Sequence, residues 1–202
     1  MTPRRAPLYG APVGLWLLSI AFAGAASPEA APYADGAAPG FSGGFKEQSC
    51  DACHFEAGIN VKPGQLTISG VPERYAAGER YELTVTLTRP EMKIGGFQLA
   101  ARFEANGAQA GALAPRPTDA NLIKVETSGG VQYANQLKAG TVLTTPGTAR
   151  WTLVWTAPPP SGPAVPGPVV FHASANAANN DEFASGDYVY TAMARSQAAL
   201  AN

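Results

Sequence analysis

The sequence contains few cysteines and histidines, and it lacks long apolar runs. Among its 202 residues there are two cysteines and two histidines. No run beyond the N-terminus reaches the roughly eighteen apolar residues that a membrane-spanning helix requires. No Ser-His-Asp pairing, phosphate-binding loop or pair of catalytic carboxylates stands out. We therefore expect neither an enzyme nor a membrane-spanning protein.

Strong charge of either sign is also missing. The formal net charge is −1. Removal of an N-terminal leader that contains Arg4 and Arg5 would leave 12 basic against 15 acidic residues, a net charge of −3. Such a mild balance argues against nucleic acid or an anionic membrane as a partner.

Both cysteines fall within one motif, Cys50-Asp51-Ala52-Cys53-His54. The pattern C-x-x-C-H is the one by which c-type haem is covalently attached to protein. Two thiols three positions apart lie on one side of a helical turn, where both can add to the vinyl groups on one edge of a porphyrin. The next residue is then carried under the ring and can bind the iron. We predict one covalent haem c, attached at Cys50 and Cys53, with His54 as the proximal iron ligand.

Other interpretations of the two cysteines remain open. A disulfide between residues three apart closes a very small loop and would stabilise the fold little. A thioredoxin-type redox motif needs a βαβ setting, which the flanking sequence does not show. A zinc site needs further Cys or His ligands nearby, and only His172 remains.

The second axial position of the iron has two candidate ligands. His172 lies in a predicted strand among small residues, and we predict it as the distal ligand, although it could be a partly buried histidine without a metal role. Met92, in the loop 89–93, is the runner-up and would raise the redox potential. A lone loop methionine is otherwise a packing residue. An open, five-coordinate iron is the third possibility.

The N-terminus has the features of a bacterial secretory signal peptide. Arg4 and Arg5 precede the short apolar run 13–22, and the small residues 23–26 form a cleavage site. We expect residues 1–26 to be removed on export to the periplasm or the medium, where covalent haem is assembled. No cysteine lies at the cleavage site, so no lipoprotein anchor is expected.

The rest of the chain divides into a linker, one domain and a tail. Residues 27–44 are mostly Ala, Pro, Gly and Ser, a composition typical of a flexible linker. Residues 45–192 contain the haem-binding segment followed by a single β domain. Residues 193–202 are rich in alanine, and we expect them to form a frayed tail.

Short runs of alternating apolar and polar residues predict a mainly β fold. The expected strands lie at residues 66–69, 81–88, 95–103, 122–125, 130–133, 150–156, 168–174 and 187–191. Glycine and proline turn signals separate them without interleaved helices, which favours an antiparallel β-sandwich. One core is predicted to contain Leu83, Val85, Phe97, Leu99, Leu153 and Trp155.

The spacing of glycines and aromatic residues resembles a known family. Residues 75–81 (YAAGERY), 96–99 (GFQL) and 155–158 (WTAP) resemble the reelin N-terminal, or Reeler, domain. The mature chain is similar to bacterial choice-of-anchor V domain proteins, in which a C-x-x-C-H segment precedes a Reeler-like sandwich. The resemblance implies a Reeler-like β-sandwich. Many members carry a C-terminal sorting anchor; this chain ends at Asn202 without one, so we expect a soluble protein.

These features predict an exported monohaem c-type protein that carries electrons. Its expected partner is a periplasmic or extracellular redox protein that docks weakly and transiently. The alternative is a Reeler-like surface or adhesion module in which haem is structural or absent. The oxygen-rich segment 176–187 could hold calcium, but it lacks EF-hand spacing, and a polar turn is the simpler explanation.

Overall fold

The structure is a computed structural model that describes residues 35–160 and 167–199. The predicted signal peptide and residues 27–34 of the predicted linker lie outside this part of the chain. No helix among the described residues is long and apolar enough to cross a membrane.

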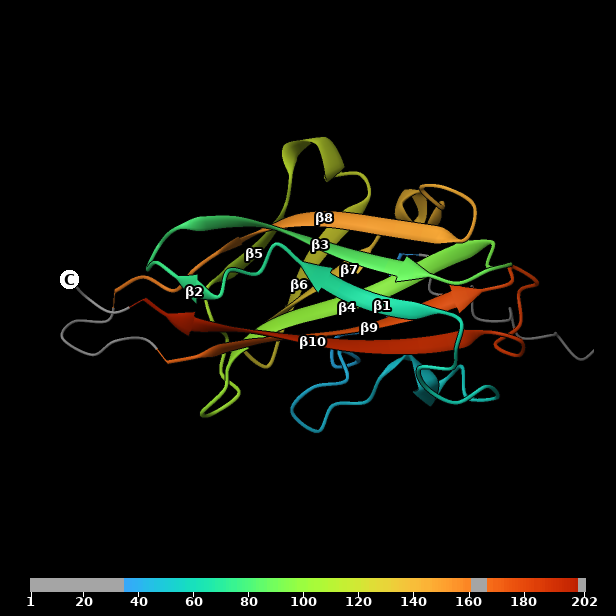
Figure 1. Cartoon of the computed structure of the whole chain (residues 1–202), viewed down its shortest axis with the longest axis horizontal. Coiled ribbons are helices and arrows are strands. Elements are labelled where there is room, and N and C mark those ends of the chain that lie inside the picture. The colour runs from blue at the N-terminus through green and yellow to red at the C-terminus, as the bar shows by residue number, and fades with distance from the viewer. Residues whose placement is uncertain (1–34, 161–166, 200–202) are drawn as a thin grey trace, which may run out of the picture. The chain divides into compact units, whose positions relative to one another are not determined.

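Ten strands of the described residues form two sheets that pack as the layers of a sandwich (Figure 1). The strands are β1 (Gln65–Ser69), β2 (Arg74–Tyr75), β3 (Arg80–Thr88), β4 (Ile94–Phe103), β5 (Ala112–Pro115), β6 (Ile123–Ser128), β7 (Val131–Gln136), β8 (Thr148–Thr156), β9 (Val169–Ala178) and β10 (Tyr188–Ala198). One sheet has the order β1-β3-β8-β5 and the other β2-β10-β9-β4-β7-β6. All pairs are antiparallel except β2 with β10. The predicted fold class, a mainly β antiparallel sandwich, is confirmed.

Three short 3₁₀ turns interrupt the strands. They are η1 (Cys50–Ala52), η2 (Pro117–Asp119) and η3 (Lys138–Thr141). Only η1 lies in the segment that carries the two cysteines.

The inner faces of the two sheets form one apolar core. All six predicted core residues belong to it, and each is exposed by 2% or less. Trp155 on β8 packs edge-on against Tyr75 and Phe171, with ring centroids 5.4 and 4.9 Å away. Its indole nitrogen donates a hydrogen bond to the Ala110 carbonyl. The alternation in the sequence therefore identified the core correctly, because these side chains face inward from both sheets.

Strand β10 extends further than the sequence predicts. Residues 193–198, expected as part of a frayed tail, continue the strand: Ser196 pairs with Val169 on β9, and Gln197 pairs with Arg74 on β2. Alanine has little preference for strands, so these residues give almost no local signal. The two neighbouring strands hold them in the sheet through backbone hydrogen bonds.

Strand β4 is buried on both faces, although alternation predicts only an inner apolar face. Its outward-facing Gln98 and Arg102 are 0% and 8% exposed. Residues from 38 to 47, part of the blue trace in Figure 1, contact them. The amides of Gly40 and Phe41 donate to Gln98 Oε1, and Gln98 Nε2 donates to the Ala38 carbonyl at 2.8 Å. Residues 35–44, the described part of the predicted linker, thus pack on the sheet, because the Gln98 amide pairs with their backbone.

Candidate functional site

The Cys50–His54 segment lies on the outer face of the six-stranded sheet. It begins with the 3₁₀ turn η1, in which the His54 amide donates to the Cys50 carbonyl at 3.0 Å. The Cys50 amide donates to Ser174 Oγ on β9, also at 3.0 Å. One short turn therefore presents both cysteines and the histidine, and a hydrogen bond fastens it to the sheet.

Neither cysteine forms a disulfide. Cys53 is exposed and Cys50 is half-buried. Burial raises the pKa of the Cys50 thiol to about 11, and a hydrogen bond with Ser174 acts in the opposite direction. Redox-active C-x-x-C motifs use a cysteine whose pKa is lowered. The environment of Cys50 therefore does not favour thioredoxin-type chemistry.

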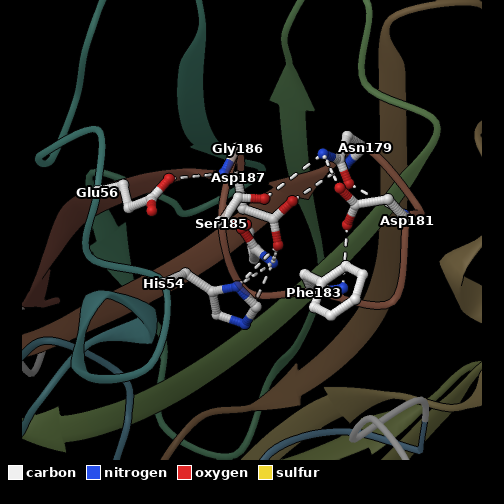
Figure 2. A network of polar contacts seen from close by, with 9 residues as sticks. His54, Glu56, Asn179, Asp181, Phe183, Ser185, Gly186 and Asp187 are labelled. Carbon is white, nitrogen blue, oxygen red and sulfur yellow. Dashed lines mark hydrogen bonds and ion pairs between the residues drawn. The ribbon is translucent and has the colours of Figure 1, made fainter.

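His54 is held through one ring nitrogen by a buried carboxylate. Its Nδ1 lies 2.7 Å from Asp187 Oδ2, and the Asp187 side chain is 2% exposed against 28% for His54. Asp187 also accepts hydrogen bonds from Asn176 Nδ2 and the Asn179 amide (Figure 2). The Asn176 amide nitrogen lies 3.2 and 3.4 Å from the two ring nitrogens of His54. A proton on Nδ1 points at the carboxylate, which leaves the lone pair on Nε2, 3.4 Å from the Asn176 amide nitrogen.

Two of the three carboxylates in the oxygen-rich segment 176–187 point at the protein itself. Asp181 accepts hydrogen bonds from Asn179 Nδ2 and the Phe183 amide, while Asp187 contacts His54. Within residues 35–160 and 167–199, no group of three or more His, Cys, Asp or Glu side chains is placed to hold a metal ion. The segment is a polar turn in this structure.

Large apolar side chains are exposed next to His54. Phe55, the next residue in the chain, is 72% exposed, and Phe183, on the loop before Asp187, is 67% exposed. Ile59 is also exposed and pairs in a β-bridge with Val189 on β10. Single exposed apolar residues are ordinary on protein surfaces, but a group of them marks a binding site.

The predicted distal ligand His172 lies on the same face of β9 as Asn176. Four residues separate the two, roughly 13 Å along a strand. The ring of Phe45 lies edge-on to the His172 ring with centroids 5.5 Å apart, and Gly44 also contacts it. Burial lowers the pKa of His172, and the nearby positive charge of Arg102 adds to the effect. The structure therefore does not bring His172 beside His54.

Met92, the runner-up distal ligand, belongs to the core of the sandwich. Its side chain is 5% exposed and packs with the inner faces of the sheets. This is the packing role that the sequence left open for it. Ligation by Met92 would require the side chain to leave the core.

Sequence reasoning missed the partners that hold the segment. It placed Asp187 and Asn176 in a polar loop and did not connect them with His54. In sequence, 122 residues separate Asn176 from His54, so no local pattern reveals the contact. A second missed partner is Arg102, which pairs with Glu47 beneath the segment. A charged residue in an otherwise apolar strand was the available signal, because a buried charge needs a partner.

No protein family model matches the chain, and no curated protein matches it. Among solved structures, it is similar to the reeler domain of human F-spondin, with 22% identity over 66% of this chain and 89% of that domain and a TM-score of 0.42. It is also similar to a cohesin module of a Clostridium perfringens family 33 glycoside hydrolase, with 10% identity, coverage of 67% and 96%, and a TM-score of 0.45.

A third similar structure is AvmM, which catalyses macrocyclization in alchivemycin A biosynthesis. It shares 15% identity over 71% of this chain and 92% of that protein, with a TM-score of 0.41. At such low similarity no activity, substrate or partner is carried over from any of the three.

Proposed function

We propose that this chain is an exported monohaem c-type protein that transfers electrons. The haem would be attached at Cys50 and Cys53, and His54 would bind the iron. The observation that supports this most strongly is the contact between His54 Nδ1 and buried Asp187 at 2.7 Å. In histidines that bind metals, the N–H of the other ring nitrogen commonly donates a hydrogen bond to a carboxylate, which fixes the ring and its tautomer. When bound, the haem supplies the Fe(III)/Fe(II) couple.

The surrounding residues support this assignment in three ways. Ser174 fixes the backbone of Cys50, so one attachment point is set by the sheet. Cys53 is exposed, which suits the attachment of a group from outside the fold. Phe55 and Phe183 offer apolar surface beside the imidazole. An attached group would lie at the surface, where a periplasmic or extracellular redox protein can dock briefly.

His172 remains the proposed distal ligand, and the structure defines a condition for it. Gly44 and Phe45 cover its ring, and His172 lies four positions along β9 from Asn176, which contacts His54. Both the turn and the segment that carries His54 must therefore move before the two histidines can bind the same iron. Phe45 has a φ of 53° and Lys46 a φ of 68°, which are unfavourable for residues with side chains. This strain lowers the cost of opening the turn.

A visible spectrum tests the proposal. Protein produced with a haem-maturation system should show the Soret and α bands of a c-type haem after purification. The double variant Cys50→Ala, Cys53→Ala should be colourless. A colourless wild-type protein under these conditions would contradict the proposal.

A second candidate function is a module that binds a partner protein, with haem structural or absent. The exposed apolar residues Phe55, Ile59 and Phe183 favour it, because such groups often mark protein-binding sites. The spectrum separates the two candidates. Colour that does not change with redox state, or no colour at all, would favour the binding module.

A further inference from the structure

The Asp187 carboxylate is fixed from both of its oxygens. Oδ1 accepts a hydrogen bond from the Asn179 amide at 3.1 Å, and Oδ2 accepts one from Asn176 Nδ2 at 3.0 Å. Oδ2 also contacts His54 Nδ1. A carboxylate that is 2% exposed needs such partners. Its position relative to the imidazole is therefore set by the fold.

The segment that carries His54 and the loop that carries Asp187 are joined by a second contact. Glu56 follows His54 by two positions, and its Oε2 accepts a hydrogen bond from the Gly186 amide at 3.1 Å (Figure 2). The first contact orients the imidazole ring, and the second joins the segment that carries it to the loop. Binding of the iron by His54 alone would not require a buried carboxylate next to its Nδ1.

We propose that Asp187 is a positioning residue that also tunes His54 toward ferric iron. By accepting the Nδ1 proton, the carboxylate makes Nε2 a stronger electron donor. Ferric iron carries one more positive charge than ferrous iron and gains more from such a ligand and from a nearby negative charge. Asp187 thus lowers the midpoint potential of the attached haem. This inference rests on the proposed haem attachment.

If Asp187 only holds the loop in shape, its substitution should have the same effect as substitution of another residue that holds the loop. Asp181 is that control residue. Asp181 lies in the same loop and holds it through Asn179 Nδ2 and the Phe183 amide, but it is not bonded to His54. If only the loop shape matters, Asp181→Asn should change the potential as much as Asp187→Asn does. If the carboxylate acts through the imidazole, Asp187→Asn alone should change it.

The first measurement is a redox titration of the haem-loaded protein and its variants. Asp187→Asn should reduce the preference for the ferric state about tenfold, the lower end of the effect of removing such a ligand partner. For a one-electron couple, this raises the midpoint potential by about 59 mV. Asp181→Asn should match the wild type, and Asp187→Glu should recover part of the shift. Equal potentials for wild type and Asp187→Asn would overturn the inference.

The second measurement uses the protein without haem. In mildly alkaline buffer, ¹⁵N NMR of the imidazole should show His54 protonated at Nδ1 in the wild type. Asp187→Ala should shift the population toward the Nε2-protonated tautomer. A wild-type His54 protonated mainly at Nε2 would refute the role of Asp187 even if the potential changes.

The two proposals fail in distinguishable ways. A wild-type chain that attaches no haem would refute the proposed function, and the tuning by Asp187 with it. A chain that attaches haem, but whose potential and tautomer do not respond to Asp187, would refute only the tuning.

Discussion

Gly44 lies directly against the ring of His172, and a Cβ at this position would overlap the Cγ, Cδ2 and Cβ atoms of the histidine. Gly44→Ala should therefore destabilise the protein by about 1–3 kcal/mol, the usual cost of overpacking a close contact. Urea unfolding measures this cost. Gly167→Ala is the matched control, because no atom of the residues that the structure describes lies within 4 Å of the added methyl group. Equal stabilities of the two variants would show that the turn does not pack on His172.

Glu47 is the acidic partner of a mostly buried ion pair beneath the cysteine segment. Its carboxylate contacts Arg102, whose side chain is 10% exposed, and accepts hydrogen bonds from Ser42 and Tyr133. Glu47→Ala would leave the Arg102 charge buried without its partner. We expect a loss of about 3–5 kcal/mol in the free energy of unfolding.

The control for Glu47 is an ion pair at the surface. Glu104 and Arg195 are 46% and 39% exposed, and water screens their interaction. Glu104→Ala should cost much less stability than Glu47→Ala. A similar loss in both variants would mean that Glu47 does not anchor the segment.

At the scale of the elements, Trp155 on β8 packs between the two sheets. Trp155 is fully buried and packs on Tyr81 as well as on residues of the opposite sheet. Trp155→Ala should cost about 3–5 kcal/mol, because it leaves a large cavity in the core. Thermal or urea unfolding measures the loss. Val142→Ala, at a site that is 70% exposed, should have little effect.

The elements also show why part of the structure could be predicted. Strands such as β3 and β8 alternate within nine residues, so their inner faces are visible in the sequence itself. The end of β10 shows no such alternation in the sequence, because Ala192, Ala194 and Ala198 take their conformation from neighbouring strands. Strands β2 and β5, of two and four residues, are too short to give a pattern.

The candidate site divides in the same way. The Cys50–His54 motif is local, and the sequence alone predicts its chemistry. The contacts of His54 with Asp187 and of Glu47 with Arg102 join residues far apart in the chain. Only the fold brings them together, so no pattern within a few residues could predict them.

At the scale of the whole molecule, the iron's second ligand is the prediction that depends on most parts of the fold. With His172 as distal ligand, the ferric haem should be low-spin and bis-His. His172→Ala should shift the Soret and α bands and open the iron to added imidazole. Met92→Leu should leave the spectrum unchanged, because Met92 packs in the core. A long-wavelength methionine–iron band in the wild type would refute His172 and assign Met92.

The central claim is the covalent haem on Cys50 and Cys53, and the intact mass of the denatured protein tests it most directly. Wild-type protein, produced with a haem-maturation system, should exceed the mass of its processed chain by one haem and keep its colour on a denaturing gel. The double variant Cys50→Ala, Cys53→Ala should have the mass of its bare chain. A wild-type mass equal to that of the bare processed chain would contradict the account.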